Sequence, residues 1–261
     1  MKISIIGGGN MGGAIAQGLS TGLFFKPEDI TVITKTEVTA FKLKEFNPSL
    51  NAVAGVYDSL STADIVVVAV KPWLVEELLS EHKDKLTNPD QILVSVASGI
   101  SLEQLAGWSV QGKPVFRVMP NTAIAEKQSM TFVSSLNAQK EQTEMIVRIF
   151  NELGKTELID EKLLSAATSL ASCGIAYAFR YIRAAMEGGV EMGLYPNQAK
   201  QIVMQTLLGA VKLLEANDTH PEAEIDKVTT AGGITIKGLN EMEHAGFTSA
   251  VIRGLKASNV K

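Results

Sequence analysis

The chain has 261 residues, 46% of them hydrophobic and 20% charged, which is typical of a globular protein and unlike a disordered chain. Its formal net charge of −4, without a basic stripe, argues against a nucleic-acid groove or an anionic membrane surface as partner. Cys173 is the single cysteine, which excludes an internal disulfide, and the most apolar stretch, 65–70, is far shorter than a membrane helix. We therefore expect a cytoplasmic protein that binds neither nucleic acid nor membrane.

The first part of the chain alternates between short β-branched runs and helical patterns. Strands are predicted at 3–6, 30–34, 65–70, 92–96 and 115–118, with later ones at 130–134 and 156–159. Helices are predicted between them, for example at 10–21, 38–46 and 139–153. Strands that are almost continuously apolar and are separated by helices are typical of a parallel sheet covered on both faces. The fold class is therefore α/β, with a doubly wound, mainly parallel Rossmann sheet.

The pattern becomes entirely helical after Asp160. A long helix rich in Ala, Leu and Ser is predicted over 162–193, and further helices over 196–215, from 221, over 233–245 and over 249–257. We expect a Rossmann domain over 1–159 and an all-helical domain over 160–261. A long helix rich in small residues is difficult to bury within a domain of about 100 residues. We therefore expect this helix to pack on a second copy of the chain.

A glycine-rich turn follows the first predicted strand. Residues 7–12 read Gly-Gly-Gly-Asn-Met-Gly, which matches the G-x-G-x-x-G pattern between a strand and a helix. Gly7 permits the tight turn, Gly9 lets the backbone approach a pyrophosphate, and Gly12 allows close helix–strand packing. With Asn10 and Met11 they form the expected dinucleotide site, at the positive end of the following helix.

The end of the second predicted strand indicates which dinucleotide binds. NAD enzymes carry an acidic residue there for the ribose hydroxyls. This chain instead has Thr34, Lys35 and Thr36, and the first carboxylate is Glu37. Lys35 and the two hydroxyls would attract the 2′-phosphate that a carboxylate would repel, so NADPH is favoured over NADH. The alternative is that Lys35 is an ordinary solvated loop residue.

Two more strand ends should border the cofactor, because ligands of doubly wound sheets bind at the carboxyl ends of the strands. The first carries Val70, Lys71 and Pro72, and proline biases Lys71 towards an extended conformation. Lys71 is interpreted either as a surface lysine or as a contact to cofactor or substrate. The second carries small residues, among them Ala97, that leave room for a nicotinamide ring.

A late segment places threonines and glycines directly before a predicted helix. Residues 228–239 read Val-Thr-Thr-Ala-Gly-Gly-Ile-Thr-Ile-Lys-Gly-Leu. Thr229 or Thr230 could cap this helix, and its free backbone N–H groups could hold a carboxylate. An ordinary capped helix start is the alternative for this segment taken alone.

The order and spacing of four motifs resemble those of pyrroline-5-carboxylate reductases over nearly the whole chain. The motifs are the glycine turn, Ala-Val-Lys-Pro at 69–72, Arg-x-Met-Pro-Asn-Thr at 117–122 and Val-Thr-Thr-x-Gly-Gly-x-Thr-Ile at 228–236. The resemblance implies a Rossmann domain that binds NADPH and a helical domain that interlocks with a partner subunit. It also implies homodimers, often assembled further, with substrate bound between cofactor and helical domain.

The same resemblance implies roles for individual residues. Thr230 and the backbone from Gly232 and Gly233 to Thr235 would hold the substrate carboxylate. The Thr235 hydroxyl would face the ring nitrogen, which makes Thr235 the candidate catalytic residue. Glu161 aligns with a position near the family's substrate.

The chemistry implied is hydride transfer from NADPH to the imine carbon of 1-pyrroline-5-carboxylate, giving L-proline. Such a step depends mainly on positioning, and the sequence offers no obvious cluster of catalytic acids, bases or metal ligands. His82, His220 and His244 lack the spacing of metal ligands, so no metal is expected. A six-membered cyclic imine is an alternative substrate.

The sequence also departs from the family pattern. Residues 172–177 read Ser-Cys-Gly-Ile-Ala-Tyr where the family has Gly-Ser-Gly-Pro-Ala-Tyr, so we expect a more regular long helix. Ala231 replaces a proline, and Lys227 replaces a common asparagine that reaches the cofactor.

Two rival functions stay open at this point. One is a β-hydroxyacid dehydrogenase, although Lys162, the best-placed lysine, lacks the asparagine that usually follows the catalytic one. The other is a non-catalytic NADPH-binding sensor or scaffold, for which the altered stretch in the long helix would be the sign.

Overall fold

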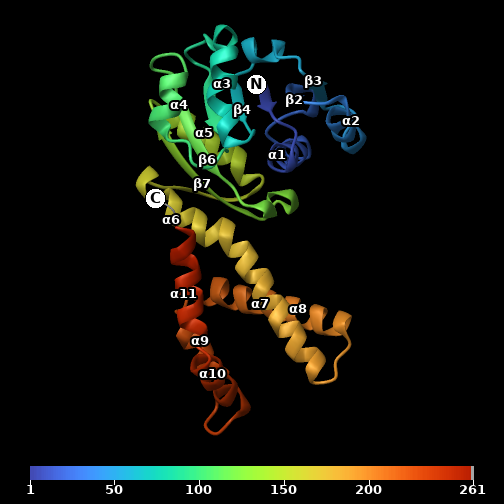
Figure 1. The fold of residues 1–261 in the computed structure, drawn as a ribbon, viewed down its shortest axis with the longest axis vertical. Coiled ribbons are helices and arrows are strands. Elements are labelled where there is room, and N and C mark those ends of the chain that lie inside the picture. The colour runs from blue at the N-terminus through green and yellow to red at the C-terminus, as the bar shows by residue number, and fades with distance from the viewer. Residues whose placement is uncertain (260–261) are drawn as a thin grey trace. The chain divides into compact units, whose positions relative to one another are not determined.

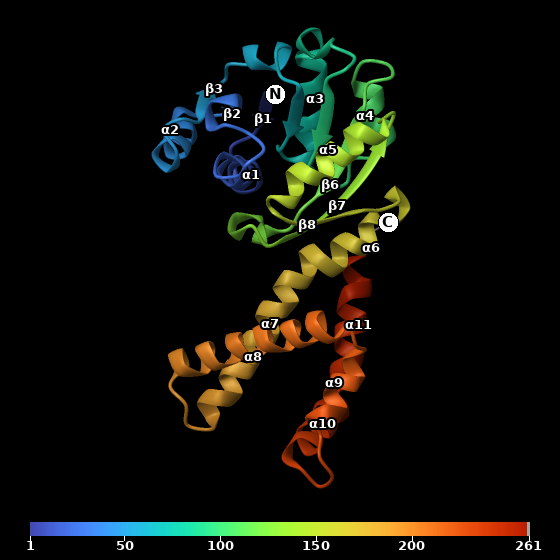
Figure 2. The same ribbon diagram turned by 180° about the vertical axis from the view of Figure 1, so that it is seen from behind.

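A computed structural model describes residues 1–259 of the chain (Figures 1 and 2). By their internal contacts the residues form two compact units, which divide between Ser172 and Cys173. The first unit is a sheet with helices, and the second is entirely helical. Residues 160–172, assigned to the helical half from sequence, pack with the sheet: Leu164 is buried against Met119 and Phe132.

The first unit is built on one eight-stranded sheet. Its order is β3-β2-β1-β4-β5-β6-β7-β8, and every neighbouring pair is parallel except β6 and β7. The strands are β1 (Ile3–Ile6), β2 (Ile30–Thr34), β3 (Asn51–Ala54), β4 (Ile65–Val68), β5 (Ile92–Ser95), β6 (Val115–Met119), β7 (Ser129–Leu136) and β8 (Gly154–Leu158). β1 lies between β2 and β4, so the chain reverses its direction of winding at this strand.

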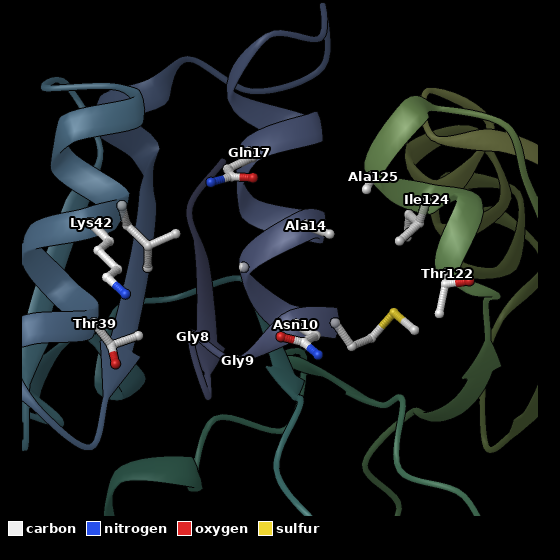
Figure 3. A pocket seen from close by; sticks show the side chains of 13 residues that line it. Gly8, Gly9, Asn10, Ala14, Gln17, Thr39, Lys42, Thr122, Ile124 and Ala125 are labelled. Atoms are coloured by element: carbon white, nitrogen blue, oxygen red, sulfur yellow. The ribbon is translucent and has the colours of Figure 1, made fainter. Parts of the chain in front are cut away.

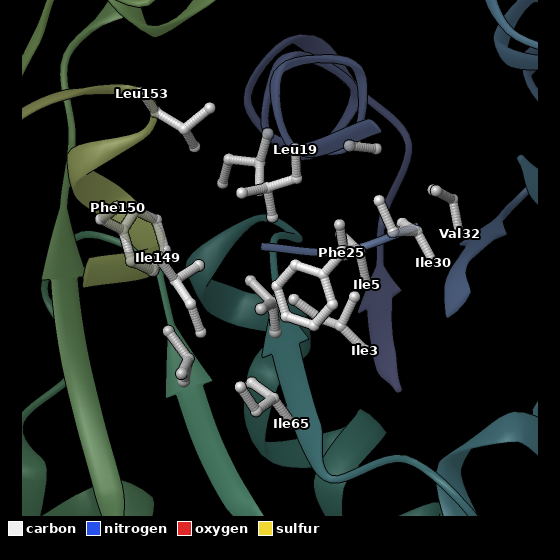
Figure 4. Close-up of a cluster of buried hydrophobic side chains, with 14 of the residues drawn as sticks. Ile3, Ile5, Leu19, Phe25, Ile30, Val32, Ile65, Ile149, Phe150 and Leu153 are labelled. Atoms are coloured by element: carbon white, nitrogen blue, oxygen red, sulfur yellow. The ribbon is translucent and has the colours of Figure 1, made fainter. Parts of the chain in front are cut away.

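Helices cover both faces of this sheet, as the apolar strands predicted. Alternate residues of one strand enter opposite cores: Ile3 and Ile5 of β1 belong to one cluster, and Ile6 to the other. The first cluster lies under α1, α2 and α5, and Figure 4 shows Leu19 and Phe150 packed over it. The second lies under α3 and α4. These helices are α1 (Asn10–Ser20), α2 (Glu37–Phe46), α3 (Val75–Glu81), α4 (Leu102–Trp108) and α5 (Lys140–Asn151).

One strand of the sheet was not predicted from the sequence. β3 reads Asn-Ala-Val-Ala and lies at the edge, where only Ala52 is buried. Asparagine and alanine are depleted in strands, so the segment has little local β signal. It is held instead by pairing with β2, supported by a hydrogen bond from Asn51 Nδ2 to Thr31 Oγ1 of 3.0 Å.

The remaining helices follow the predicted order, but the long helix is not regular. They are α6 (Leu164–Thr168), α7 (Gly174–Glu191), α8 (Pro196–Asn217), α9 (Pro221–Lys227), α10 (Ile234–His244) and α11 (Phe247–Ser258). A π-helical turn, Ser169–Cys173, joins α6 to α7. The unbroken helix predicted over 162–193 is therefore wrong, because the π-turn interrupts it next to the altered 172–175 stretch. Replacing Gly and Pro removes only the cost of these residues in a helix interior. The π-turn is held by side-chain hydrogen bonds, which are described below.

The helical unit buries very little of its own surface. Among residues 173–259, only Gly189 and Ala199 are buried. Large apolar side chains such as Phe179, Met192 and Ile202 are more than half exposed. A set of helices with this much exposed apolar surface needs a further covering surface. No helix of residues 1–259 combines the length and apolarity that crossing a bilayer requires.

A buried lysine connects three loops at the amino-terminal edge of the sheet. Lys113 is 1% exposed, and its Nζ donates to Asn88 O at 2.7 Å and to Gln91 Oε1 at 3.1 Å. The Gln91 amide in turn donates to the carbonyls of Leu60 and Ala63. Burial lowers the pKa of Lys113 to about 8.

This burial predicts a specific pH dependence of stability. Between pH about 8 and the ordinary value of 10.5, the unfolded chain binds a proton that the folded chain does not. The contribution of Lys113 to stability should therefore rise with pH across this window. Relative to Lys113→Met, the wild type should gain roughly 2 kcal/mol of unfolding free energy between pH about 8 and about 10. Denaturant unfolding at both pH values measures it; parallel pH profiles for the two proteins would contradict it.

Candidate nucleotide and carboxylate sites

Three of the four glycines in the 7–12 turn, Gly7, Gly9 and Gly12, are glycine for different structural reasons. Gly7 has φ +106°, and a Cβ there would lie 2.5 Å from Ala69 O. A Cβ at Gly12 would lie 2.0 Å from Gly7 O, so only glycine permits this approach of helix to turn. Around Gly9 no heavy atom lies within 4 Å of the Cβ position. Gly7 and Gly12 are thus required by the fold, whereas Gly9 leaves an open surface, as the sequence pattern predicts.

The first turn of α1 offers unsatisfied donors next to this open surface. Gly9 is the N-cap and supplies no side-chain hydrogen bond, and the first turn contains no acidic residue. The first helical bond runs from Gly13 N to Gly9 O at 2.7 Å. The N–H groups of residues 10–12 therefore have no acceptor within the helix. They point out of the start of α1, where the helix dipole is positive. A pyrophosphate fits this donor set and the space left open at Gly9.

A groove of about 680 Å³ runs beside α1 and reaches the glycine turn. Figure 3 shows Thr39 and Lys42 of α2 on one side of α1, and Thr122 and Ile124 on the other. Asn10 lies at the end of the groove, at the start of α1. Lys42 was not singled out from the sequence, and Thr122 was noted only as part of the 117–122 motif, because nothing in the local pattern links either residue to residues 7–12.

A second cavity, of about 350 Å³, lies at the carboxyl ends of β1, β2 and β4. It brings together four predicted cofactor residues, Gly7, Thr34, Lys35 and Val70. Its other walls include Tyr57, Leu74 and Leu78, which the sequence reasoning missed. Assigning β3 would have placed Tyr57 at this edge, because it follows that strand.

The three candidates for binding a 2′-phosphate differ in accessibility. Thr34 is 2% exposed, and its hydroxyl donates to Thr36 O at 2.9 Å and Val53 O at 3.2 Å. The expectation that this hydroxyl is open to a phosphate is therefore wrong, since it is buried and already bonded to the backbone. Thr36 is the N-cap of α2, and its Oγ1 accepts from Thr39 N. Lys35 and Thr36 are both exposed.

Of the other two strand ends, the one at 70–72 has the backbone that the sequence predicts. Lys71 is exposed and extended (φ −63°, ψ 144°), as Pro72 predicts. Val70 is half-buried in the wall of the second cavity. Ala97 is 5% exposed, and its N–H donates to Ser95 Oγ at 3.2 Å.

The start of α10 resembles that of α1. Its N-cap is Gly233, which supplies no side-chain cap, and the first turn has no acidic residue. The expectation that Thr229 or Thr230 caps the helix is wrong: Thr229 Oγ1 donates instead to Ile225 O at 2.7 Å. Gly232 has φ +70°, a conformation that favours glycine.

The threonines beside this helix start are well placed to assist its N–H groups. A Cβ at Gly233 would meet Thr230 Oγ1 at 2.6 Å, so this hydroxyl lies directly beside the turn. Thr235 is exposed in the first turn of α10. Backbone N–H groups and two hydroxyls together suit a carboxylate.

Glu161 is already engaged by two donors. Its Oε1 accepts from Arg117 Nη1 at 2.7 Å and from the backbone N–H of Leu102 at 2.8 Å. The carboxylate thus connects β6, the start of α4 and the segment after β8. This bracing contact was missed from the sequence, because Glu161 and Arg117 are 44 residues apart.

The two lysines that the sequence reasoning singled out in the helical half are both paired. Lys162 Nζ lies 2.8 Å from Asp160 Oδ2, and this hydrogen bond raises the pKa of Lys162. A general acid works best with a pKa near the working pH, so the pairing disfavours the acid role of a β-hydroxyacid dehydrogenase lysine. Lys227 Nζ donates to Glu224 at 2.6 Å, and with Thr219 it lowers the pKa of Glu224 to about 2. Within residues 1–259, no three His, Cys, Asp or Glu side chains are grouped to hold a metal.

The glycine turn generates a test that separates folding from binding. A methyl at Gly9 meets no atom of the protein but occupies the open surface. We expect Gly9→Ala to weaken NADPH binding by at least about 10-fold while the melting temperature stays within a few degrees. Gly12→Ala should instead lower the melting temperature, since its methyl would overlap Gly7 O.

Gly107→Ala is the matched control, because Gly107 lies in α4 with no atom within 4 Å of its Cβ position. It should bind NADPH normally. Fluorescence titration and thermal melting measure both properties. Full NADPH affinity in Gly9→Ala would contradict the binding role of the turn.

Comparison with known proteins agrees with this geometry. Residues 161–261 match the family described as pyrroline-5-carboxylate reductase dimerisation, and residues 2–99 match NADP oxidoreductase, coenzyme F420-dependent. Pyrroline-5-carboxylate reductase 1 of Dictyostelium discoideum is 39% identical over 99% of this chain, which spans 49% of that relative's length. Reductase 2 of the same organism is 34% identical over 100% of this chain and 91% of its own length.

A solved structure supports the same assignment. Plasmodium falciparum pyrroline carboxylate reductase with NADP bound has a TM-score of 0.88 and 27% identity, covering 99% of this chain and 95% of that one. Both the sequence likeness and the structural likeness therefore extend over the Rossmann sheet and the helices together. The chain belongs to the pyrroline-5-carboxylate reductase family.

Proposed function

We propose that this chain reduces 1-pyrroline-5-carboxylate to L-proline with hydride from NADPH, NADH being a weaker donor. The observation that carries the proposal is the pair of uncapped helix starts, at Gly9 in the Rossmann unit and at Gly233 in the helical unit. Each suits one anionic group of the two reactants: the cofactor pyrophosphate and the substrate carboxylate. Family membership supports this pairing of sites.

On the cofactor side, each predicted contact has a distinct task. The N–H groups of Asn10, Met11 and Gly12 would bind the pyrophosphate at the start of α1. Lys35 and Thr36, both exposed, would bind the 2′-phosphate that distinguishes NADPH from NADH. When bound, NADPH supplies a hydride from C4 of its reduced ring.

The apolar walls of the second cavity complete the cofactor site. Val70, Leu74 and Tyr57 would pack against the adenosine portion. Lys71 and Pro72 directly follow Val70 at the same edge of the sheet. The small side chain of Ala97, at the end of β5, would leave room for the nicotinamide ring.

On the substrate side, we assign the carboxylate to the start of α10. The N–H groups that follow Gly232 and Gly233 have no side-chain cap to compete with it. The Thr230 hydroxyl lies beside this turn and would donate a further hydrogen bond. An anion here also gains from the positive end of the helix dipole. We retain Glu161 as a candidate near the substrate, acting through Arg117 and Leu102, which already hold its carboxylate.

The chemical step then needs little more than alignment. Once its nitrogen carries a proton, the cyclic imine accepts hydride at carbon, and the π electrons of the C=N bond remain on nitrogen as the amine lone pair. Such a nitrogen takes its proton from water. The Thr235 hydroxyl would orient this nitrogen and relay a proton to it. Holding both reactants in register supplies the acceleration.

We further propose that the chain acts as a homodimer through its C-terminal helices, with larger assemblies built from dimers. A groove of about 720 Å³ lies between α7, α10 and α11, with apolar walls that include Tyr181, Phe247 and Val251. A partner's helices would cover it and the other exposed apolar side chains. On this view residues 1–159 bind NADP and residues 160–261 bind substrate and the partner. The match of residues 161–261 to a dimerisation family supports the contact with the partner.

A steady-state assay tests the proposed function. The wild type should oxidise NADPH in the presence of pyrroline-5-carboxylate, faster than NADH, and should be inactive with keto acids. In the same assay Lys35→Ser should narrow the preference for NADPH by about 10-fold, since one charged hydrogen bond to the 2′-phosphate is lost. Turnover of keto acids but not of the imine would refute the function, and higher activity with a six-membered imine would change the substrate. An unchanged cofactor preference in Lys35→Ser would remove that residue from the site.

Thr235 generates a second prediction. Removing its hydroxyl in Thr235→Ala should lower kcat by about 10- to 100-fold without changing NADPH affinity, because the hydroxyl acts on the substrate nitrogen. Thr235→Ser keeps the hydroxyl and should retain most of the activity. Rapid kinetics with both variants measures this difference, and near-normal turnover in Thr235→Ala would exclude Thr235 from the mechanism.

A further inference from the structure

The π-turn Ser169–Cys173 marks the place where the long helix leaves the sheet unit. It follows α6 and precedes α7, and the two compact units divide within it, after Ser172. A π-turn shifts the hydrogen-bond ladder by one residue, so backbone groups at this point lose their usual helical partners. Such turns occur often at functional sites.

Two hydroxyls stabilise the turn from within the helix. Thr168 Oγ1 donates to Leu164 O at 2.7 Å, and Ser169 Oγ donates to Ser165 O at 3.0 Å. Bonds of this kind to the carbonyl four residues earlier bend helices. They are local, however, and do not tie the turn to the sheet.

Asn121 provides the tie to the sheet. Its Nδ2 donates to Ala171 O, inside the π-turn, at 3.2 Å. Its Oδ1 accepts from Ala123 N at 3.0 Å, and its backbone N–H donates to Ser129 Oγ at 3.1 Å. The residue is 5% exposed, so this one side chain joins the π-turn to the segment after β6 in a buried position. A longer contact, from Ser172 Oγ to Pro120 O at 3.4 Å, lies beside it.

The segment that Asn121 caps also borders the groove at the glycine turn. Asn121 is the N-cap of the 3-10 helix Thr122–Glu126. Thr122 and Ile124 of that helix line the groove together with Gly9 (Figure 3). A single asparagine therefore holds both a wall beside the proposed cofactor site and the turn from which α7 begins.

We propose that Asn121 is a positioning residue for hydride transfer, which aligns the cofactor with the substrate by fixing the π-turn. The inference rests on the proposed function, in which α7 belongs to the substrate-binding half of the chain. Hydride transfer depends steeply on the separation of the reacting atoms, and a misplacement of about 1 Å costs roughly 100-fold in rate. Asn121 touches neither reactant in this role and acts through the turn.

Other contacts hold residues 161–164 on the sheet unit, so loss of the hydrogen bond from Asn121 to Ala171 should leave the fold intact. Leu164 is 1% exposed and packs with Met119 and Phe132. Upstream, Glu161 is held by Arg117 and the Leu102 N–H. Loss of the Asn121 amide therefore frees the turn without detaching α6.

Asn121→Ser is the test, because a serine at an N-cap still accepts from the Ala123 N–H but is too short to reach Ala171. The matched control is Asn47→Ser: Asn47 Oδ1 accepts from Ser49 N at 3.1 Å in the same kind of turn, at a half-buried position outside the proposed site. We expect kcat of Asn121→Ser to fall by at least about 10-fold, with KM for the imine and Kd for NADPH within about two-fold. Hydrogen exchange in residues 169–175 should accelerate, while the control matches wild type in every measurement.

Two results would overturn the proposal. One is a kcat within about two-fold of wild type despite faster exchange in the turn. The other is a loss of NADPH affinity and melting temperature in step with kcat, which indicates general disruption. Asn121→Asp, which keeps the acceptor and removes the donor, replaces the serine variant if that variant does not fold. Wild type that fails to reduce the imine refutes the proposed function itself, whereas active wild type with fully active Asn121→Ser refutes only the positioning role.

Discussion

Within residues 1–259, three helices begin at a glycine that offers no side chain to the first turn: α1, α10 and α11. Two of these starts, those of α1 and α10, shape the proposed chemistry. α1 starts at Gly9 and α10 at Gly233, both without a capping hydrogen bond or an acidic residue in the first turn. By contrast, α2 and α4 are capped by Thr36 and Ser101. Unsatisfied N–H groups need a partner, and an anion is the partner that the helix dipole favours most. α1 lies in one compact unit and α10 in the other, so the proposed binding of two anionic reactants uses both halves of the chain.

The sheet around the first of these sites could be predicted from the sequence because its signals are local. Runs such as Ile65–Val68 are too apolar to face water on either side, and the helices between them require parallel neighbours. The glycine turn could also be predicted, because a Cβ at Gly7 or Gly12 would overlap neighbouring backbone atoms. The edge strand β3 was missed because its stability comes from pairing with β2 and not from its own residues.

The parts that could not be predicted depend on residues distant in sequence. No local pattern shows that the Thr34 hydroxyl donates hydrogen bonds to the carbonyls of Thr36 and Val53, or that Glu161 binds Arg117. The irregular long helix has the same origin. Its sequence lacks the Pro and one Gly of the family pattern, yet a π-turn forms there, with Asn121 bonded to it from 50 residues away. Local propensity gave the wrong expectation because hydrogen bonds from hydroxyls and from the sheet act on the backbone at this point.

The most direct test of the account is a crystal structure of the chain with NADP⁺ and L-proline bound together. The account predicts pyrophosphate oxygens on the N–H groups that follow Gly9, and the proline carboxylate on those that follow Gly233. It also predicts that nicotinamide C4 faces proline Cδ, the carbon next to the ring nitrogen that does not carry the carboxylate. Ligands bound in separate places, or a proline carboxylate held away from the start of α10, would contradict it.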